Sequence, residues 1–265
     1  MSDASPFAAD LAALAWLVEL GADEALAEAP VDRFALAEAA PAVPAPRRQE
    51  AAAPPVAAAP DPGMESEAIA AACATLDALR AAVEGFEGCA LKKGARRTVF
   101  ADGNPRARLM VIGEGPGREE DMTGLPFVGR SGKLLDLMLG AIGLGRAAAE
   151  PGASVYITNV LPWRPPGNRE PSSDEIAMMK PFLFRHIELK APEAILLLGS
   201  PATRTVLGTS QGVARLRGRW AQWRGIPAMP TFHPAAVLRD PIKKREVWAD
   251  LLTLSEKLGG HGGGA

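Results

Sequence analysis

Four short apolar runs, each followed by a polar loop and a helical stretch, constrain the fold of this chain most strongly. The runs lie at residues 108–112, 155–158, 194–198 and 226–232. Helical patterns follow them at 133–142, about 173–189, after residue 201 and about 241–258. Short apolar strands that alternate with helices indicate a parallel sheet covered on both faces. We therefore predict an α/β fold with three layers, α/β/α, around a central, mainly parallel four-stranded sheet.

The rest of the chain divides into an extension, a linker, a domain and a tail. Residues 1–39 predict a helical extension, because Phe7, Leu11, Leu14 and Val18 share one face of a helix over 5–20. This helix either folds back on the domain or binds a protein partner. Residues 40–63 are mostly Ala and Pro and predict a disordered linker. The domain spans 64–258, begins with a helix at about 65–84, and precedes a flexible Gly-rich tail at 259–265.

Charge is distributed unevenly along the chain, although the formal net charge is only −2. Residues 1–85 hold 4 Lys+Arg and 14 Asp+Glu, a balance of −10, and the remainder holds 25 and 17, a balance of +8. A basic domain suits a phosphate-binding surface, and it is also common without nucleic acid. The acidic N-terminus is unlike a signal peptide, and no apolar run has the roughly 20 residues of a membrane span. We expect a cytoplasmic protein that does not bind membranes, with a monomer as the default.

Cysteine and histidine usage argues against a structural metal. The chain has two cysteines, Cys73 and Cys89, with no CxxC, and its three histidines form no metal-binding pair.

Two glycine-rich loops do not match the nucleotide-binding motifs that they resemble. In GEGPGREED, Arg118 occupies the position of the third dinucleotide-motif glycine, and in GRSGKL the phosphate-loop Ser/Thr is replaced by Leu134.

Polar signatures follow all four predicted strands, where open α/β sheets bind ligands. They are Gly113–Gly117, the segment 159–168, Gly199-Ser200 and His233-Pro234. In the separate segment 124–129, Phe127 is either a core residue or a platform for a flat base. The polar side chains of the four loops also allow two interpretations: they stabilise a turn or cap a helix, or they contact a base or a phosphate. Arg215, Arg217 and Arg219 occupy alternate positions of an expected hairpin or edge strand. They either form a solvated edge of the sheet or a stripe that binds phosphates.

Together these segments resemble the family 4 uracil-DNA glycosylases over roughly residues 85–258. The resemblance is carried by GEGPGREEDMTGLPFVGRSGKLL (113–135), YITNVLPWRPPGNRE (156–170), LLLGSPA (196–202), RGRW (217–220) and FHPAAVLRDP (232–241). It implies a DNA repair enzyme that hydrolyses the uracil–deoxyribose bond in single- and double-stranded DNA and leaves an abasic site. The target base must leave the helical stack for this reaction.

The resemblance also implies roles for individual residues. Phe127 stacks on the uracil, Asn159 reads its polar edge with Gly115 nearby, and His233 stabilises negative charge on the leaving base. Further catalytic positions that shape the pocket or orient water are Glu114, Glu120 and Asn168. The segment Val237, Leu238 and Arg239 matches a loop that enters the duplex. Independently of the resemblance, Arg164 and Arg169 on a stiff, proline-rich loop and Arg217 in the arginine stretch suit contacts with DNA phosphates.

The chain departs from the family in its cysteines. Most members hold a [4Fe–4S] cluster with four cysteines, and here only Cys89 remains, with Phe86, Trp163 and Met179 at the other three positions. One thiolate cannot hold such a cluster, so we predict that it is absent and that no cofactor is needed.

Two further departures leave alternatives open. Ala235 replaces the serine that usually follows His-Pro, and the basic, histidine-containing insertion of relatives that trap DNA covalently is missing before RGRW. We expect ordinary hydrolysis and release. The alternatives are a uracil- or abasic-DNA-binding protein with weak turnover, and a glycosylase for another deaminated base.

Overall fold

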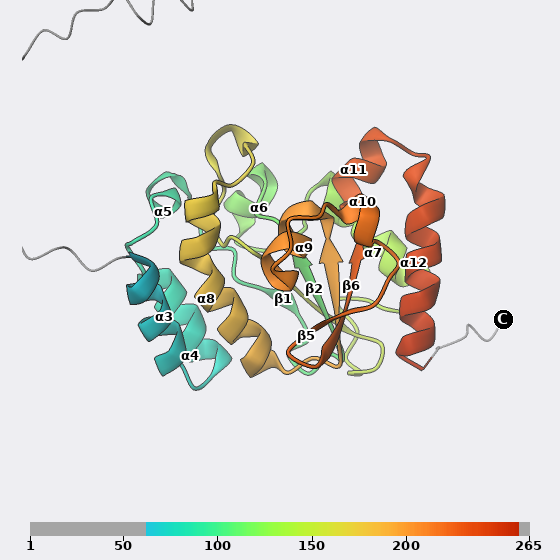
Figure 1. The fold of residues 1–265 in the computed structure, drawn as a ribbon, viewed down its shortest axis with the longest axis horizontal. Helices are drawn as coiled ribbons and strands as arrows, with labels where there is room; N and C mark the ends of the chain where they lie inside the picture. Colours follow the sequence, from blue (N-terminus) through green and yellow to red (C-terminus); the bar gives the residue numbers. More distant parts are fainter. Residues whose placement is uncertain (1–61, 260–265) are drawn as a thin grey trace, which may run out of the picture. The chain divides into compact units, whose positions relative to one another are not determined.

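A six-stranded sheet forms the centre of the fold in the computed structural model, which describes residues 62–259. The strand order is β1-β3-β2-β4-β6-β5, and the four inner strands are parallel (Figure 1). Their bounds are β1 Asp102–Gly103, β2 Leu109–Gly113, β3 Val155–Asn159, β4 Ala194–Leu198, β5 Ala221–Trp223 and β6 Ile226–Thr231. The α/β fold and the parallel core of four strands are confirmed, and the sheet has two further short strands at its edges.

Helices cover both faces of the sheet, because the inner strands are apolar on both sides. Alternate residues of one strand enter different cores: Met110 and Ile112 pack on one face, Leu109 and Val111 on the other. The first face is covered by α3, α4, α8 and α9, the second by α7 and α12 (Figure 1). The bounds are α3 Pro62–Ala72, α4 Leu76–Gly85, α5 Leu91–Gly94, α6 Arg118–Thr123, α7 Arg130–Gly140, the 3₁₀ turn η1 Pro166–Asn168, α8 Ser173–Lys190, α9 Gly199–Leu207, α10 Val213–Leu216, α11 Pro234–Arg239 and α12 Lys243–Lys257.

Several predicted boundaries were wrong. The helix expected at 65–84 is two helices, because the Thr75 hydroxyl accepts a hydrogen bond from Ala78 N and caps a new helix, α4. The start of α3 also places residues 62 and 63 in a helix rather than in the linker. The arginine stretch 215–219 is not a hairpin strand, since α10 and a turn precede β5. The expected helix at 5–20, most of the linker and most of the tail lie outside the described residues.

The order of the strands places the ligand-binding edge. The chain runs from β2 to its neighbour β3, then crosses to β4 on the other side of β2. This reversal creates a crevice beyond the carboxyl ends of the strands. The register pairs Gly113 with Asn159, the last residues of β2 and β3, so the loops that follow begin side by side. Within residues 62–259, no helix has the length and apolar character needed to span a membrane.

Candidate active site

A cleft of about 680 Å³ opens at the carboxyl edge of the sheet. The loops after β2, β3, β4 and β6 all contribute to its walls. The residues predicted from the sequence that line it are Glu114, Gly115, Glu120, Phe127, Asn159, Asn168, Arg169, Gly199, Ser200, His233 and Arg239. The four polar signatures that follow the strands therefore meet in one place.

Asn159 places a polar amide at the floor of the cleft. Its side chain is 6% exposed, and its Oδ1 atom has no hydrogen-bond partner among the described residues. A Cβ atom on Gly113 would come within 2.4 Å of this oxygen and 2.5 Å of Phe127 Cζ, so only glycine fits beside it. A buried acceptor without a donor is costly in a folded protein. The oxygen is therefore suited to a ligand that brings its own N–H or O–H group.

Phe127 forms an aromatic wall of the cleft. Its ring lies 5.4 Å from the His233 ring, with an interplanar angle of 30°. The residue is 5% exposed, and its φ of 55° is a left-handed conformation that costs a side-chain-bearing residue about 1–2 kcal/mol. Gly132 of α7 leaves room for this backbone, since a Cβ there would come within 1.8 Å of Phe127 O.

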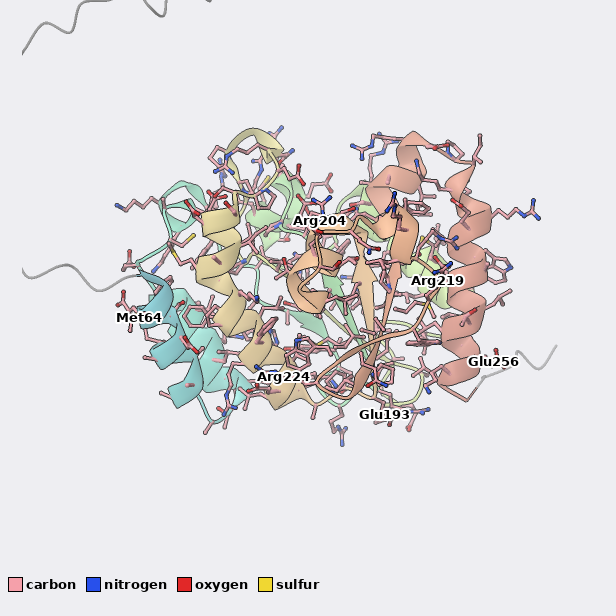
Figure 2. The ribbon with its side chains drawn as sticks, viewed as in Figure 1. Met64, Glu193, Arg204, Arg219, Arg224 and Glu256 are labelled. Atoms are coloured by element: carbon pink, nitrogen blue, oxygen red, sulfur yellow. The ribbon has the colours of Figure 1, made fainter. Side chains whose placement is uncertain are left out.

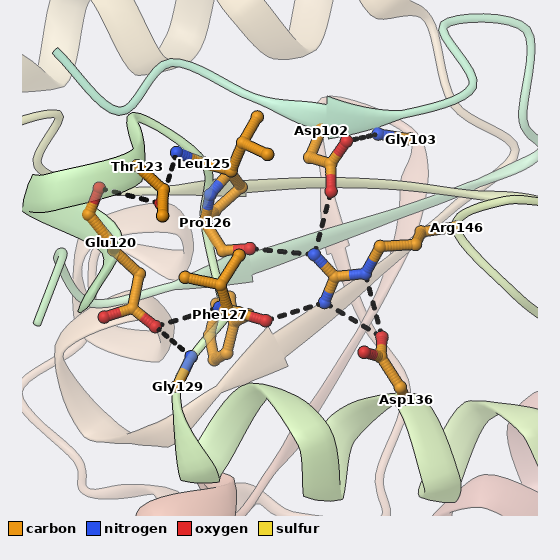
Figure 3. A network of polar contacts seen from close by, with 11 residues as sticks. Asp102, Gly103, Glu120, Thr123, Leu125, Pro126, Phe127, Gly129, Asp136 and Arg146 are labelled. Atoms are coloured by element: carbon orange, nitrogen blue, oxygen red, sulfur yellow. Dashed lines mark hydrogen bonds and ion pairs between the residues drawn. The ribbon is translucent and has the colours of Figure 1, made fainter.

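Glu120 holds the loop that carries Phe127. Its Oε1 accepts hydrogen bonds from Val128 N at 3.0 Å and Gly129 N at 2.9 Å, and its Oε2 accepts one from Gly117 N at 3.0 Å (Figure 3 shows the Gly129 contact). The carboxylate is thus occupied by backbone amides. Its geometry suits the shaping of the pocket that we predicted for this residue more than the activation of water.

Arg146, which was not among the predicted site residues, reaches the same loop from the other side. Its guanidinium donates to the carbonyl oxygens of Pro126 and Phe127, both at 2.9 Å (Figure 3). Arg146 lies in a loop between α7 and β3, with no motif around it that would have singled it out.

His233 caps helix α11 and is held as a neutral donor. Its Nδ1 atom accepts a hydrogen bond from Ala235 N at 3.1 Å. In the neutral ring the proton is then on Nε2. Burial lowers the pKa of His233 to about 4, and the positive charge of Arg239 contributes in the same direction. At neutral pH the imidazole can donate one hydrogen bond without carrying a charge.

Glu114 differs from Glu120 in its electrostatic environment. Burial raises the pKa of the Glu114 carboxyl, and the nearby Glu170 carboxylate adds to the rise, while Arg239 opposes it. A half-buried carboxylate of this kind can stabilise a cation or accept a proton from water.

The loop between β3 and α8 supplies the basic rim. Arg164 Nε donates to Asn168 Oδ1 at 2.7 Å, which fixes the Asn168 side chain in the turn η1. Arg169 pairs with Glu175, whose carboxylate also completes the capping box of α8 with Ser172. Both arginines remain near the solvent, and each already has a partner in the free protein.

Two predicted DNA contacts do not fit the structure. Val237 is 1% exposed and packs in the core, so its side chain cannot enter a duplex; Leu238 beside it is 41% exposed. Arg217 was expected on an exposed strand, and instead its guanidinium binds the Asp250 carboxylate and Glu246 O. The sequence could not show these partners, because Asp250 lies on the distant helix α12.

The residues at the four cluster positions do not fit an iron–sulfur cluster. Phe86, Cys89, Trp163 and Met179 are all buried in one apolar core. The Phe86 ring packs edge-on against Phe182 at 5.2 Å, and Trp163 Nε1 donates to Thr98 Oγ1 at 3.0 Å. Burial raises the pKa of the Cys89 thiol, which disfavours a thiolate ligand. Within residues 62–259, no group of three His, Cys, Asp or Glu side chains is arranged to hold a metal.

The cleft therefore combines an aromatic wall, a buried acceptor, a neutral imidazole donor and a half-buried carboxylate. Such a set suits a flat ring with alternating polar groups on its edge, next to a bond that breaks with charge separation. Residues 100–252 match the uracil DNA glycosylase superfamily. This match covers more than half of the chain and defines the class of protein.

Comparison with individual proteins defines the family within that class. A protein of Saccharolobus solfataricus named type-4 uracil-DNA glycosylase is 36% identical over 192 residues, or 69% of this chain and 86% of that protein. A protein of the same name from Archaeoglobus fulgidus is 35% identical, covering 70% and 94%, and one from Thermotoga maritima is 39% identical, covering 60% and 80%. The chain belongs to the type-4 uracil-DNA glycosylase family.

Proposed function

We propose that this protein is a monofunctional glycosylase that hydrolyses the N-glycosidic bond of uracil in single- and double-stranded DNA. Water adds to C1′ of the deoxyribose, the C1′–N1 bond breaks, and the products are free uracil and an abasic site. The observation that carries the proposal is the unpaired Asn159 Oδ1 in the same cleft as Phe127 and His233.

Recognition of uracil follows from the hydrogen-bonding groups of the cleft. The uracil N3–H group donates to Asn159 Oδ1, and the ring lies against Phe127. Cytosine has an unprotonated N3 atom in this position, so two acceptors would face each other in a buried site. This repulsion favours release of uracil and not of cytosine.

Bond breaking follows from the charge that develops on the two products. His233 Nε2–H donates to the O2 atom of uracil as it becomes anionic, and one such preorganised donor is worth roughly 3–4 kcal/mol. Glu114 stabilises the cationic sugar, and Asn168, which lines the same cleft, orients the water. Gly115, which lines the cleft, contributes to the uracil-binding pocket. Arg164, Arg169 and Arg239 contact phosphates, and Leu238 is the apolar residue that enters the duplex.

The proposal includes no iron–sulfur cluster, since apolar packing now occupies the positions that would ligate it. We further propose that the protein is located in the cytoplasm and acts as a monomer. A protein partner for the extension 1–39 stays a prediction.

A uracil-containing oligonucleotide, treated with the protein and then with hot alkali, tests the proposed activity. Alkali cleaves the strand at abasic sites, so we expect scission at the uracil in single- and double-stranded DNA. A gel shift on abasic DNA without scission would show that the protein binds DNA with little turnover. The replacement of the usual serine by Ala235 is the observation that favours this alternative. Scission only at hypoxanthine or xanthine would show that the protein is a glycosylase for another deaminated base.

A further inference from the structure

We propose that Arg146 is a positioning residue that holds the Phe127 ring against the target base. The inference rests on the proposed uracil chemistry and adds a residue outside the cleft lining to it. Arg146 is not among the residues that line the cleft, and it acts through the backbone of Pro126 and Phe127.

The guanidinium of Arg146 joins two elements, β1 and α7, to the short loop that carries Phe127. Nη1 donates to Asp102 Oδ2 of β1 and to Pro126 O, Nη2 donates to Phe127 O, and Nε donates to Asp136 Oδ1 of α7. Each of these four contacts is 2.9 Å long. Figure 3 shows the guanidinium plane lying between the loop, the strand and the helix, with the Phe127 carbonyl directed at it.

Both sides of the loop are therefore fixed. Arg146 binds the carbonyl oxygens of residues 126 and 127, while Glu120 binds the amides of residues 128 and 129. Phe127 lies between them with its left-handed φ of 55°. Such a conformation persists when the surroundings over-determine it. Without the two carbonyl contacts the backbone can relax toward an ordinary φ, which would turn the ring away from the position beside His233.

The two aspartates explain why the residue is an arginine. Its fork of donors can satisfy two carboxylates and two carbonyls at once. The Arg146 side chain is 17% exposed, and its contacts with Asp102 and the two carbonyls are partly buried, whereas the contact with Asp136 lies at the surface. A lysine offers a single ammonium group and cannot span all four acceptors. The contact with Asp102 also gives the two-residue edge strand β1 a role in supporting the cleft.

The test compares Arg146→Met and Arg146→Lys with a matched control, Arg108→Met, in the full-length protein. Arg108 also joins a carboxylate and a carbonyl, Glu193 Oε2 and Leu258 O, but at the other end of the sheet, where Figure 2 labels Glu193. The measurements are the single-turnover rate of uracil release, inhibition by free uracil, and affinity for undamaged DNA.

We expect Arg146→Met to lower the single-turnover rate on the order of 10- to 100-fold, as small misplacements of a binding group do. Inhibition by free uracil weakens in parallel, affinity for undamaged DNA stays within twofold, and Arg146→Lys recovers part of the rate. Arg108→Met keeps the wild-type rate and uracil inhibition, even if its melting temperature falls.

Equal rates and equal uracil inhibition for Arg146→Met and Arg108→Met would overturn the positioning role alone. If Arg146→Met does not fold, Arg146→Lys and Asp136→Asn decide, and wild-type values for both would overturn it. A wild-type protein that releases no uracil would overturn this proposal together with the proposed function.

Discussion

At the scale of single residues, His233 has two roles that substitutions can separate. Its Nδ1 atom caps α11, and its Nε2–H group is the proposed donor to uracil. Asparagine is a good N-cap but is too short to replace the donor. We expect His233→Asn to lower the rate of uracil release 10²- to 10³-fold with little loss of stability, whereas His233→Ala loses the rate and about 1 kcal/mol of stability. Single-turnover kinetics and urea unfolding of the two variants check this; near-wild-type kinetics in both would remove His233 from the mechanism.

The low pKa of His233 predicts how the rate depends on pH. With a pKa of about 4, the imidazole is already neutral at pH 6 and stays neutral at pH 8. The donor is therefore in the same protonation state throughout this range. We expect the single-turnover rate to show no step from the titration of this histidine between pH 6 and 8. A rate that falls tenfold per unit above pH 6.5 in the wild type, and no longer does so in His233→Asn, would show that the charged form is the active one.

Residue types at the strand ends were the most informative part of the sequence. Asn159, Phe127 and His233 were expected at one uracil site. Asn159 ends β3 and His233 follows β6, and the structure brings these two together because parallel strands end at one edge. Phe127 joins them from the loop between α6 and α7. The partners that hold them were not predictable. Arg146 and the Arg217–Asp250 pair depend on contacts between distant elements, which no local pattern records.

At the scale of elements, the long apolar strands were predictable and the short edges were not. Each inner parallel strand is a continuous apolar run, whereas β1 and β5 have two and three residues and pair only at the sheet margins. The segment of helix α11 was predicted to be a loop, because His-Pro is typical of a turn. In the structure His233 is the N-cap of this helix and Pro234 is its first residue. That helix explains why Val237 is buried and Leu238 exposed.

The loop between β3 and α8 makes a prediction about DNA binding. Arg164→Ala and Arg169→Ala should each weaken binding to all sequences and reduce the salt dependence of log K by about one unit, because each removes one phosphate contact. The rate at saturating protein should change far less. Fluorescence anisotropy over a series of salt concentrations measures both quantities, with Arg108→Ala as the control. An unchanged salt slope in both variants would show that the two arginines contact only Asn168 and Glu175 and bind no phosphate.

At the scale of the whole molecule, two histidines with lowered pKa values make stability depend on pH. Burial lowers the pKa of His186 to about 3 and that of His233 to about 4, whereas both are near 6.5 in the unfolded chain. The unfolded state therefore binds more protons below pH 6.5, and stability falls as pH falls from 6.5 toward 4. The slope approaches about 2.7 kcal/mol per pH unit if both sites act fully. Urea unfolding at pH 7.5 and 5.5 measures the change, and His186→Gln should reduce it; an equal change in that variant would rule out His186 as a source.

The apolar core around Phe86, Cys89, Trp163 and Met179 makes a second prediction for the molecule as a whole. Purified protein should contain far less than four iron and four sulfide per chain, and a chelator should leave its unfolding temperature unchanged, since packing around Phe86 and Trp163 holds these loops. Stoichiometric iron and acid-labile sulfide would contradict this.

The direct test of the whole account is the quantity of free base released in one turnover. A single-stranded oligonucleotide with one uracil is incubated with excess protein, and free uracil and abasic sites are both counted before any alkali is added. We expect one uracil for each abasic site with the strand intact, no base released from the matching cytosine oligonucleotide, and a rate lowered on the order of 100-fold in Asn159→Ala. Release of no uracil, or equal release by wild type and Asn159→Ala, would contradict it.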